Sequence, residues 1–227
     1  MGDPPLSIII PVLNEAGEIG ATLAALRPMR ARGCEVIVAD GGSTDGSPEI
    51  ARGLADAVVA CGRGRARQQN AGAAVARGEV LLFLHADTRL PEDADARVTG
   101  GLRRSGRGWG RFDVRLAGRH PMLRVIERMM GLRSRLTGIA TGDQAIFVRR
   151  AWFQRIGGFP DMPLMEDVAL SAALKRLGPP LALRDTVRTS SRRWEERGVW
   201  RTMALMWRLR LEFWAGVDPA KLAERYR

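Results

Sequence analysis

The sequence predicts an α/β fold in which a mostly parallel sheet is flanked by helices. Short apolar runs alternate with helical patterns about every 20 to 25 residues through residues 1–90, as they do in βαβ units. These apolar runs are continuous, which is typical of strands that helices cover on both faces. Because 45% of the 227 residues are hydrophobic, the chain can bury a sizeable core. We therefore expect a single domain over residues 1–227.

Each element of the first part follows from its local pattern. The run "LSIIIPV" predicts a buried strand over residues 6–12, and the helix after it carries Ile19, Leu23 and Leu26 at helical spacing. Pro48 favours the first turn of a second helix. Further strands are expected over 34–40, 56–61 and 79–85, with an alanine-rich helix over 65–78.

The pattern becomes irregular after residue 90. In "GRFDVRLAG" apolar and charged residues alternate, which predicts a half-exposed strand of the antiparallel type over 110–118. Helices are expected over 120–137, 165–178 and 195–215, and a short strand over 144–150. The chain thus divides into residues 1–90, residues 91–195, and a C-terminal helix and tail over 196–227.

Charge and cysteine content limit the classes of partner and compartment. The net charge of +11 comes almost entirely from arginine and would attract nucleotides, nucleic acid or anionic lipid. The chain has two cysteines and no Cys-x-x-Cys pair, which fits a reducing compartment. No signal peptide and no apolar stretch of about 18 residues is evident. We expect a cytoplasmic protein, with peripheral attachment at the inner face of the membrane as an alternative.

Polar side chains follow three of the expected strands, at the point where each strand ends. Because ligands of open α/β sheets bind beyond the carboxyl ends of the strands, these side chains are candidates for one binding site. Each has an ordinary alternative as a turn residue, a helix cap or a first-turn acid. Their shared edge favours the binding site. They are Asn14 and Glu15 after the first strand, Asp40 at the end of the second, and His85 and Asp87 at the end of the fourth, and Pro11 near the end of the first strand lies at the same edge.

Several common sites are excluded by the motifs that the sequence lacks. "PVLNEAGE" stands where a dinucleotide-binding domain has Gly-x-Gly-x-x-Gly, and no phosphate-binding loop with Gly-Lys-Ser/Thr occurs. The chain has two histidines and no Gly-x-Ser-x-Gly, which disfavours a serine hydrolase. The same small number of histidines and cysteines excludes a Cys/His metal cluster.

Four segments in order resemble family 2 glycosyltransferases of the GT-A fold, over residues 6–195. The segments are "SIIIPVLNEAGEI", "VIVADGGSTDGS", "RARQQNAGAAVARGEVLLFLHADT" and "FPDMPLMEDVALSAALKRLG". In finer detail, "RARQQNAGA", "FLHADT", "TGDQAIFVRR" and "GGFPDMPLMEDVALS" resemble a bacterial subgroup called radical-SAM/selenodomain-associated transferases, which is linked to arsenosugar biosynthesis. The resemblance implies a nucleotide-binding half over 1–90 and an acceptor and catalytic half over 91–195.

The resemblance also implies which residues bind a nucleotide-sugar donor. Carboxylates suit the N–H and hydroxyl donors of a base and ribose, and arginine suits a diphosphate. Asp45 lies near the donor-binding residues that the resemblance implies. The implied donor-binding residues are Pro11, Leu13, Asn14, Glu15, Asp40, Gly41, Ser43, Arg65, Asn70, His85, Ala86, Asp87 and Arg193.

"HAD" replaces the family's Asp-x-Asp, which holds a divalent metal on the donor diphosphate. His85 and Asp87 point to the same face of a strand, and Mn²⁺ and Mg²⁺ prefer oxygen ligands. By resemblance we expect Asp87 to bind Mn²⁺ or Mg²⁺, and His85 to contact ribose or to lie behind the metal.

"MEDVAL" supplies the catalytic element of the resemblance. An inverting transfer needs a carboxylate to take the proton of the acceptor hydroxyl, and the start of a helix favours an ionised acid. The resemblance implies that Asp167 is the base and that Glu166 orients it or contacts the acceptor, while Asp143 lines the acceptor site. The acceptor is a small molecule or a lipid. Two acids that merely begin a helix are the ordinary alternative.

The C-terminal part adds two features. "SSRRW" is similar to the Gln-x-x-Arg-Trp of processive members, but Ser190 replaces the glutamine, which disfavours synthesis of an exported polymer. The helix over 195–215 carries an apolar stripe, typical of core or of a homodimer contact, with membrane contact through basic amphipathic helices as the alternative. The stripe is formed by Trp200, Met203, Trp207, Leu211 and Trp214.

Two other functions compete with sugar transfer. A nucleotidyltransferase acting on a sugar phosphate shares the glycine-and-acid sheet edge, but it generally needs a basic first loop, and "PVLNEAGE" is acidic. The net charge suggests a nucleic-acid-binding protein, yet the arginines are scattered. We expect no nucleic-acid partner.

Overall fold

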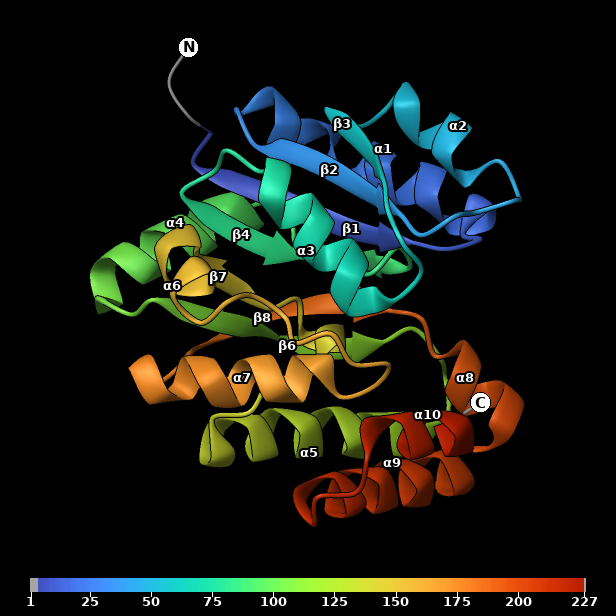
Figure 1. The fold of residues 1–227 in the computed structure, drawn as a ribbon. Helices are drawn as coiled ribbons and strands as arrows, with labels where there is room; N and C mark the ends of the chain where they lie inside the picture. The colour runs from blue at the N-terminus through green and yellow to red at the C-terminus, as the bar shows by residue number, and fades with distance from the viewer. Residues whose placement is uncertain (1–3, 227) are drawn as a thin grey trace.

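The computed structural model describes residues 4–226, apart from the side chain of Arg193. Within that range one mixed sheet of eight strands has the order β3-β2-β1-β4-β7-β6-β8-β5 (Figure 1). Its strands are β1 Leu6–Val12, β2 Glu35–Asp40, β3 Ala57–Ala60, β4 Val80–Phe83, β5 Thr88–Arg89, β6 Trp109–Leu116, β7 Phe147–Arg149 and β8 Leu181–Thr189.

Helices lie on both faces of the sheet, and the short turn η1 Gly142–Gln144 precedes β7. The helices are α1 Ala16–Ala31, α2 Ser47–Arg52, α3 Arg65–Val75, α4 Ala94–Ser105, α5 Pro121–Thr137, α6 Arg150–Arg155, α7 Glu166–Leu177, α8 Arg192–Arg197, α9 Val199–Trp214 and α10 Pro219–Tyr226. The α/β class expected from the sequence is thereby confirmed.

The first half is the parallel part of the sheet. β1 pairs in parallel with β2 and β4, and β2 pairs in parallel with β3. Successive residues of β1 enter different cores: Ile8 belongs to the cluster that includes Ile19 of α1, while Ile9 belongs to the cluster that includes Ala66 of α3. Because both faces are covered, β1 needs the continuous apolar run that predicted it.

The strand β6 corrects one expectation. It pairs antiparallel with β7 but in parallel with β8, and Arg111, which the alternating pattern placed on an exposed face, is fully buried. The Arg111 Nε donates to Ser134 Oγ at 2.9 Å, and another nitrogen of the guanidinium pairs with Asp113. A charged residue is therefore buried because partners satisfy it, and the polarity pattern of β6 is misleading.

The last part of the chain differs from the single helix expected over 195–215. Gly198, at φ +81°, separates α8 from α9, and α10 follows as an additional helix. Figure 1 shows α7, α5 and α9 below the sheet, on the side opposite β3. None of the helices in the described range is both long and apolar enough to cross a membrane.

Candidate active site

The loops after β1 and β2 form one hydrogen-bonded unit at the edge of the sheet. The Asp40 carboxylate accepts the backbone N–H of Gly42 at 3.0 Å and that of Ser43 at 3.1 Å. The Asn14 N–H donates to Ser43 Oγ at 2.9 Å, and the Asn14 side-chain oxygen accepts the N–H of Thr44 at 2.9 Å. Both predicted loops therefore lie together, and their backbones are held by the polar residues that the sequence singled out.

Glu15 lies beside this unit and near Asp87. Its N–H donates to Ser47 Oγ at 2.9 Å, while Asp45 accepts the N–H of Ala16 at 2.9 Å. Burial raises the pKa of the Glu15 carboxyl, and the charge of Asp87 raises it further. Two strand ends thus place two carboxyl groups within electrostatic reach of each other.

Gln68 also joins the two loops, and the sequence reasoning missed it. Its side-chain nitrogen donates to the Val12 carbonyl at 2.6 Å and to the Ala39 carbonyl at 3.1 Å. A Cβ added at Gly41 would lie 2.9 Å from the Gln68 amide carbon, so this glycine allows the close approach. The half-buried Pro11 and Leu13 flank the same junction. A glutamine on an alanine-rich helix gives no sequence signal of this role, because the role depends on contacts with the distant strands β1 and β2.

His85 follows β4 and faces η1. Its Nδ1 lies 3.6 Å from Asp143 Oδ1, and its buried Nε2 has no hydrogen-bond partner in the described structure. Burial and the nearby Arg65 guanidinium lower the pKa of His85 to about 4, against the opposing charges of Asp87 and Asp167. The imidazole is therefore neutral at neutral pH.

Asp167 begins α7 and reaches the same turn. Its Oδ2 accepts the Gly142 N–H at 2.7 Å, and its Oδ1 accepts the Val168 N–H at 2.7 Å. A Cβ at Gly142 would lie 2.6 Å from His85 Nε2 and 3.6 Å from Asp167 Oδ2. The end of β4, η1 and the start of α7 thus converge, and Asp143 lies on the converging turn.

Glu166 is buried beneath this group and pairs with Arg65. The Arg65 Nη1 lies 3.4 Å from Glu166 Oε1, and Glu166 is only 2% exposed. Burial raises the pKa of Glu166, the adjacent Asp167 raises it further, and Arg65 lowers it, with a net increase. Arg65 thereby connects α3 with the first turn of α7.

Asn70 lies five residues after Arg65 on α3 and has a different set of contacts. Its side-chain nitrogen donates to the Phe159 carbonyl at 2.8 Å, and its oxygen accepts the Phe159 N–H at 2.9 Å. The structure therefore gives Asn70 a part in holding the segment before α7, and its contact with a nucleotide stays a prediction. The predicted diphosphate contact of Arg193 falls on a side chain outside the described residues.

Backbone strain is concentrated at this site. Among the described residues, the non-glycine positions with positive φ are Asn14 at +57°, Ala145 at +45° and Met165 at +68°. Asn14 precedes Glu15, Ala145 follows η1, and Met165 precedes Glu166. Such strained positions cluster at functional sites, so the three turns that carry the candidate residues are held in place by the surrounding structure.

The candidate site offers few protein ligands for a divalent metal. Within residues 4–226, no three His, Cys, Asp or Glu side chains are grouped so that they could hold a metal ion. Mg²⁺ and similar ions are often held by one or two carboxylates together with substrate phosphates. The charge of Asp87 raises the pKa of Glu15, an effect that a cation on Asp87 would relieve. Asp87 with Glu15 near it is a carboxylate set compatible with a metal that a diphosphate also binds. Ala86, between His85 and Asp87, is buried, and its carbonyl accepts the Thr22 hydroxyl.

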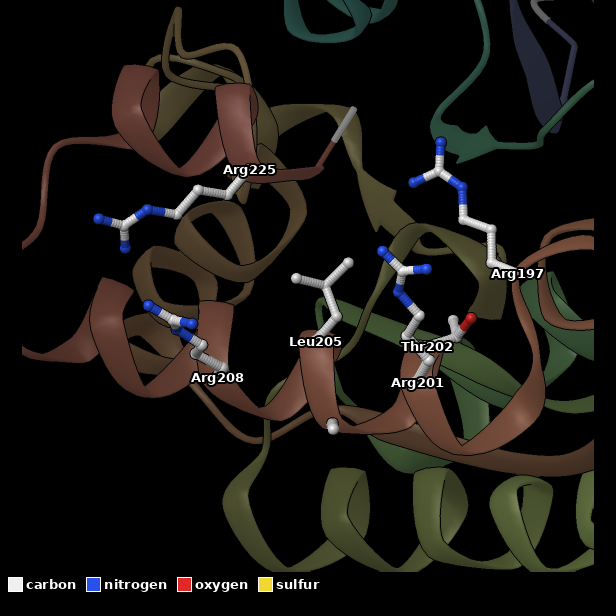
Figure 2. Close-up of a pocket in the computed structure, with 7 residues that line it drawn as sticks. Arg197, Arg201, Thr202, Leu205, Arg208 and Arg225 are labelled. Carbon is white, nitrogen blue, oxygen red and sulfur yellow. The ribbon is translucent and has the colours of Figure 1, made fainter.

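Two cavities lie near the C-terminal helices. One, of about 370 Å³, runs between α5 and α9 and includes Asp143 in its wall. The other, of about 540 Å³, lies along α9 and is lined by Arg197, Arg201, Arg208 and Arg225 (Figure 2). Neither cavity could be predicted from the sequence, because each is lined by residues from several helices that only the fold brings together.

The fold is the GT-A fold, which solved structures share. S. aureus TarS, residues 1–349, is similar with a TM-score of 0.68 at 20% identity, covering 82% of this chain and 60% of that one. The mannosyltransferase PcManGT of Pyrobaculum calidifontis, solved with GDP-Man and Mn²⁺, is similar with a TM-score of 0.61 at 22% identity, covering 83% and 57%.

Residues 7–157 match the family described as Glycosyl transferase family 2, and the chain belongs to that family. A PGL/p-HBAD biosynthesis glycosyltransferase of Mycobacterium bovis is 37% identical over 106 residues, which are 43% of this chain and 41% of the relative. The succinoglycan biosynthesis protein ExoA of Rhizobium meliloti is 55% identical over 49 residues, 21% of this chain and 15% of ExoA. The chain thus spans less than half the length of these curated relatives.

Proposed function

We propose that this chain transfers a sugar from a nucleoside-diphosphate sugar to an acceptor hydroxyl, with inversion at the anomeric carbon. The observation that carries the proposal is the position of Asp167. Its carboxylate is held by two backbone N–H groups at the start of α7, next to His85 and Asp143 at the carboxyl edge of the sheet. A fixed carboxylate at that edge is what a general base requires.

The donor half in this proposal is residues 1–90. The hydrogen-bonded loops of Asn14, Asp40 and Ser43 bind the base and ribose, and Arg65 and Arg193 bind the diphosphate. Support comes from the shared fold, because TarS has been solved with UDP-GlcNAc and PcManGT with GDP-Man. Arginine is also well matched to phosphate oxygens.

The transfer itself needs one proton acceptor and one leaving group. Asp167 takes the proton of the acceptor hydroxyl as that oxygen forms a bond to the anomeric carbon. The bond between that carbon and the diphosphate oxygen breaks, and the nucleoside diphosphate leaves with the electron pair. Asp87 would hold Mn²⁺ or Mg²⁺, which supplies charge stabilisation to the departing diphosphate.

Glu166 has a positioning role in the proposal. It is buried and paired with Arg65, so it holds the first turn of α7 against α3 and leaves the acceptor proton to Asp167. His85, with its low pKa, acts as a neutral contact to ribose. Asp143 lines the acceptor side.

Two finer points are part of the same proposal. The motif resemblance to the radical-SAM/selenodomain-associated subgroup suggests a narrower place within family 2. Nucleotidyl transfer is disfavoured, because the first loop is acidic where a triphosphate would bind, and because the family match is to glycosyl transferases.

The test is a screen of nucleotide sugars with Mn²⁺, first by thermal shift and then by release of nucleoside diphosphate. We expect one or a few donors to stabilise the protein and to release nucleoside diphosphate, with the release abolished by EDTA. Release of pyrophosphate from nucleoside triphosphate and sugar phosphate would instead identify a nucleotidyltransferase.

A further inference from the structure

The groove between α5 and α9 is apolar along its walls. Its volume is about 370 Å³, and its lining includes Met129 and Leu136 from α5 and Met203 and Trp207 from α9. A groove of this composition accepts an apolar chain. The sugar transfer proposed above gives this groove no role.

The rim of the groove is also apolar and faces solvent. Eight of the ten exposed large apolar side chains in the described part of the chain lie on α5 and α9. Leu136 on α5 is 77% exposed. On α9, Leu211 is 68% and Trp207 55% exposed, which corrects the expectation of a core stripe there and leaves the homodimer contact as a prediction. Large exposed apolar patches on a monomer mark interaction sites, and tryptophans are favoured where water meets lipid.

Arginines border this face of α9. Figure 2 shows Arg201 and Arg208 along α9, on the cavity that α9 shares with Arg197 and Arg225. On a helix, Arg201 and Arg208 follow Trp200 and Trp207 by one position, so they lie beside the aromatic stripe. A helix with an aromatic stripe and flanking arginines has the pattern of one that lies on an anionic membrane surface.

Two further arginines line the groove. Arg133 has two buried nitrogens, Nε and Nη2, without a hydrogen-bond partner in the described structure. Burial, together with the charge of Arg210, lowers the pKa of Arg133 to about 10. Burial lowers the pKa of Arg210 as well, and Arg210 forms no ion pair within 4 Å among residues 4–226. An anionic group in the groove would satisfy both guanidinium groups.

Asp143 connects the groove with the candidate active site. It lines the groove and lies 3.6 Å from His85. The charges of Asp143 and Asp167 act on both Arg133 and Arg210. A molecule whose anionic group rests on these arginines therefore has its neighbouring atoms next to the proposed base.

We propose that this groove is the acceptor subsite and that the acceptor is an anionic lipid. The apolar chain lies between α5 and α9, the anionic group binds Arg133 and Arg210, and a hydroxyl close to that group faces Asp167. This assignment rests on the proposed sugar transfer. The exposed residues of the rim contact the membrane from which the lipid enters.

The experiment compares two amphiphiles that share a twelve-carbon chain. Dodecyl phosphate and dodecyl maltoside are titrated below their micelle concentrations, and binding is followed by tryptophan emission, since Trp194 and Trp207 line the groove. We expect saturable binding of dodecyl phosphate that is at least tenfold tighter than that of the neutral amphiphile.

Substitutions then separate the head group from the chain. The double variant R133Q/R210Q should bind dodecyl phosphate at least tenfold more weakly and dodecyl maltoside as the wild type does. L132S/L136S should weaken the binding of both amphiphiles. The controls are R103Q on α4 and V75S on α3, which change an exposed arginine and an exposed apolar residue elsewhere and should change neither affinity.

Unchanged dodecyl phosphate affinity in R133Q/R210Q would overturn the inference. A stable dimer in light scattering that L132S/L136S dissociates would also overturn it, because a second copy would then cover the groove. Thermal shift with UDP or GDP and Mn²⁺ in the same samples tests the donor half separately. Nucleotide binding without amphiphile binding contradicts the lipid acceptor alone, whereas amphiphile binding without any nucleotide binding contradicts the proposed function and the acceptor role with it.

Discussion

Gly142 lies where His85 and Asp167 meet, and its missing side chain makes room for both. A Cβ at this position would lie 2.6 Å from His85 Nε2, a distance that real Cβ atoms essentially never show. The Gly142 N–H meanwhile donates to Asp167. One glycine therefore positions the proposed base through its backbone and the imidazole through its lack of a side chain.

Replacing Gly142 with alanine should displace His85 and the η1 turn without unfolding the protein. Since displacements of about 1 Å can cost about 100-fold in rate, we expect nucleoside diphosphate release to fall by about 10- to 100-fold. Steady-state kinetics and thermal unfolding measure the two effects. The matched control is Gly53→Ala, where nothing lies within 4 Å of the added Cβ and φ is −84°. A fully active Gly142→Ala would mean that His85 has no part in the reaction.

The two cysteines should differ in reactivity. Burial raises the pKa of Cys34 to about 12, and Asp95 adds to the increase. Burial also raises the pKa of the half-exposed Cys61 thiol. Because the thiolate is the reactive form, we expect the folded protein at pH 8 to react with DTNB slowly at Cys61 and hardly at all at Cys34, and both to react after denaturation. Rapid modification of both thiols would contradict the packing around β2.

The candidate residues differ in how far the sequence could predict them. Asp40, His85, Asp87 and Asp167 were identifiable because each follows an apolar strand or begins a helix. Gln68 and Arg133 were not, because a glutamine within a helix and an arginine in an arginine-rich chain carry no local pattern. Their importance depends on contacts with distant segments, which only the fold reveals.

At the scale of elements, β6 is held by a buried charge cluster. Arg111 pairs with Asp113, and Arg135 from α5 also pairs with Asp113 at 2.7 Å. Burial would raise the pKa of Asp113, but the hydrogen bonds from Arg135 and Arg111 outweigh it, and the net change is a decrease. The cluster joins β6 to α5, which forms one wall of the groove.

Asp113→Asn should destabilise the protein by about 3 kcal/mol, because removing one partner of a buried ion pair leaves an uncompensated buried charge on Arg111. Chemical denaturation measures the free energy of unfolding. Arg135→Gln removes only the more exposed partner and should cost less than about 1 kcal/mol. Equal and small effects of both substitutions would show that Arg111 is not buried as described.

The same cluster predicts a pH dependence of stability. The pKa of Asp113 is lower in the folded than in the unfolded chain, so its contribution is present above the unfolded value of about 3.9 and is lost as pH falls below it. We expect the free energy of unfolding to decrease below about pH 4 less steeply in Asp113→Asn than in the wild type. Parallel pH profiles of the two proteins would contradict this assignment.

The helices and strands, like the candidate residues, differ in how far the sequence could predict them. The strands β1 to β4 could be predicted because helices cover both faces and their apolar runs are continuous. The strand β8 was missed because it is mostly exposed or half-buried over Leu181–Thr186, so its pairing with β6 leaves little apolar pattern. The division of the last helix at Gly198 depends on a single glycine with positive φ.

At the scale of the whole molecule, the sheet edge and the C-terminal helices meet at η1. The parallel half brings the loops of Asp40 and Asn14 to one edge, while α7, α5 and α9 lie on the side opposite β3 (Figure 1). The turn at Gly142–Gln144 lies where both parts contribute residues. Donor and acceptor are thus expected to approach Asp167 from opposite sides.

Metal removal tests the assembled site. If Asp87 shares a divalent ion with the donor diphosphate, EDTA should abolish nucleoside diphosphate release and Mn²⁺ or Mg²⁺ should restore it. Asp87→Asn should reduce the release by about 100-fold or more at saturating donor and raise the Mn²⁺ concentration needed for half-maximal rate. Full activity in EDTA would exclude a metal from the donor site.

The central claim is that Asp167 is the base of a sugar transfer, and Asp167→Asn tests it most directly. Donor binding should be retained, because the amide keeps the size of the side chain and an oxygen to accept the Gly142 N–H. The turnover number for the donor found in the screen should fall by about 100- to 10,000-fold. The predicted result is therefore retained donor binding together with this loss of turnover, measured as nucleoside diphosphate release at saturating donor. Full turnover in Asp167→Asn would contradict the account.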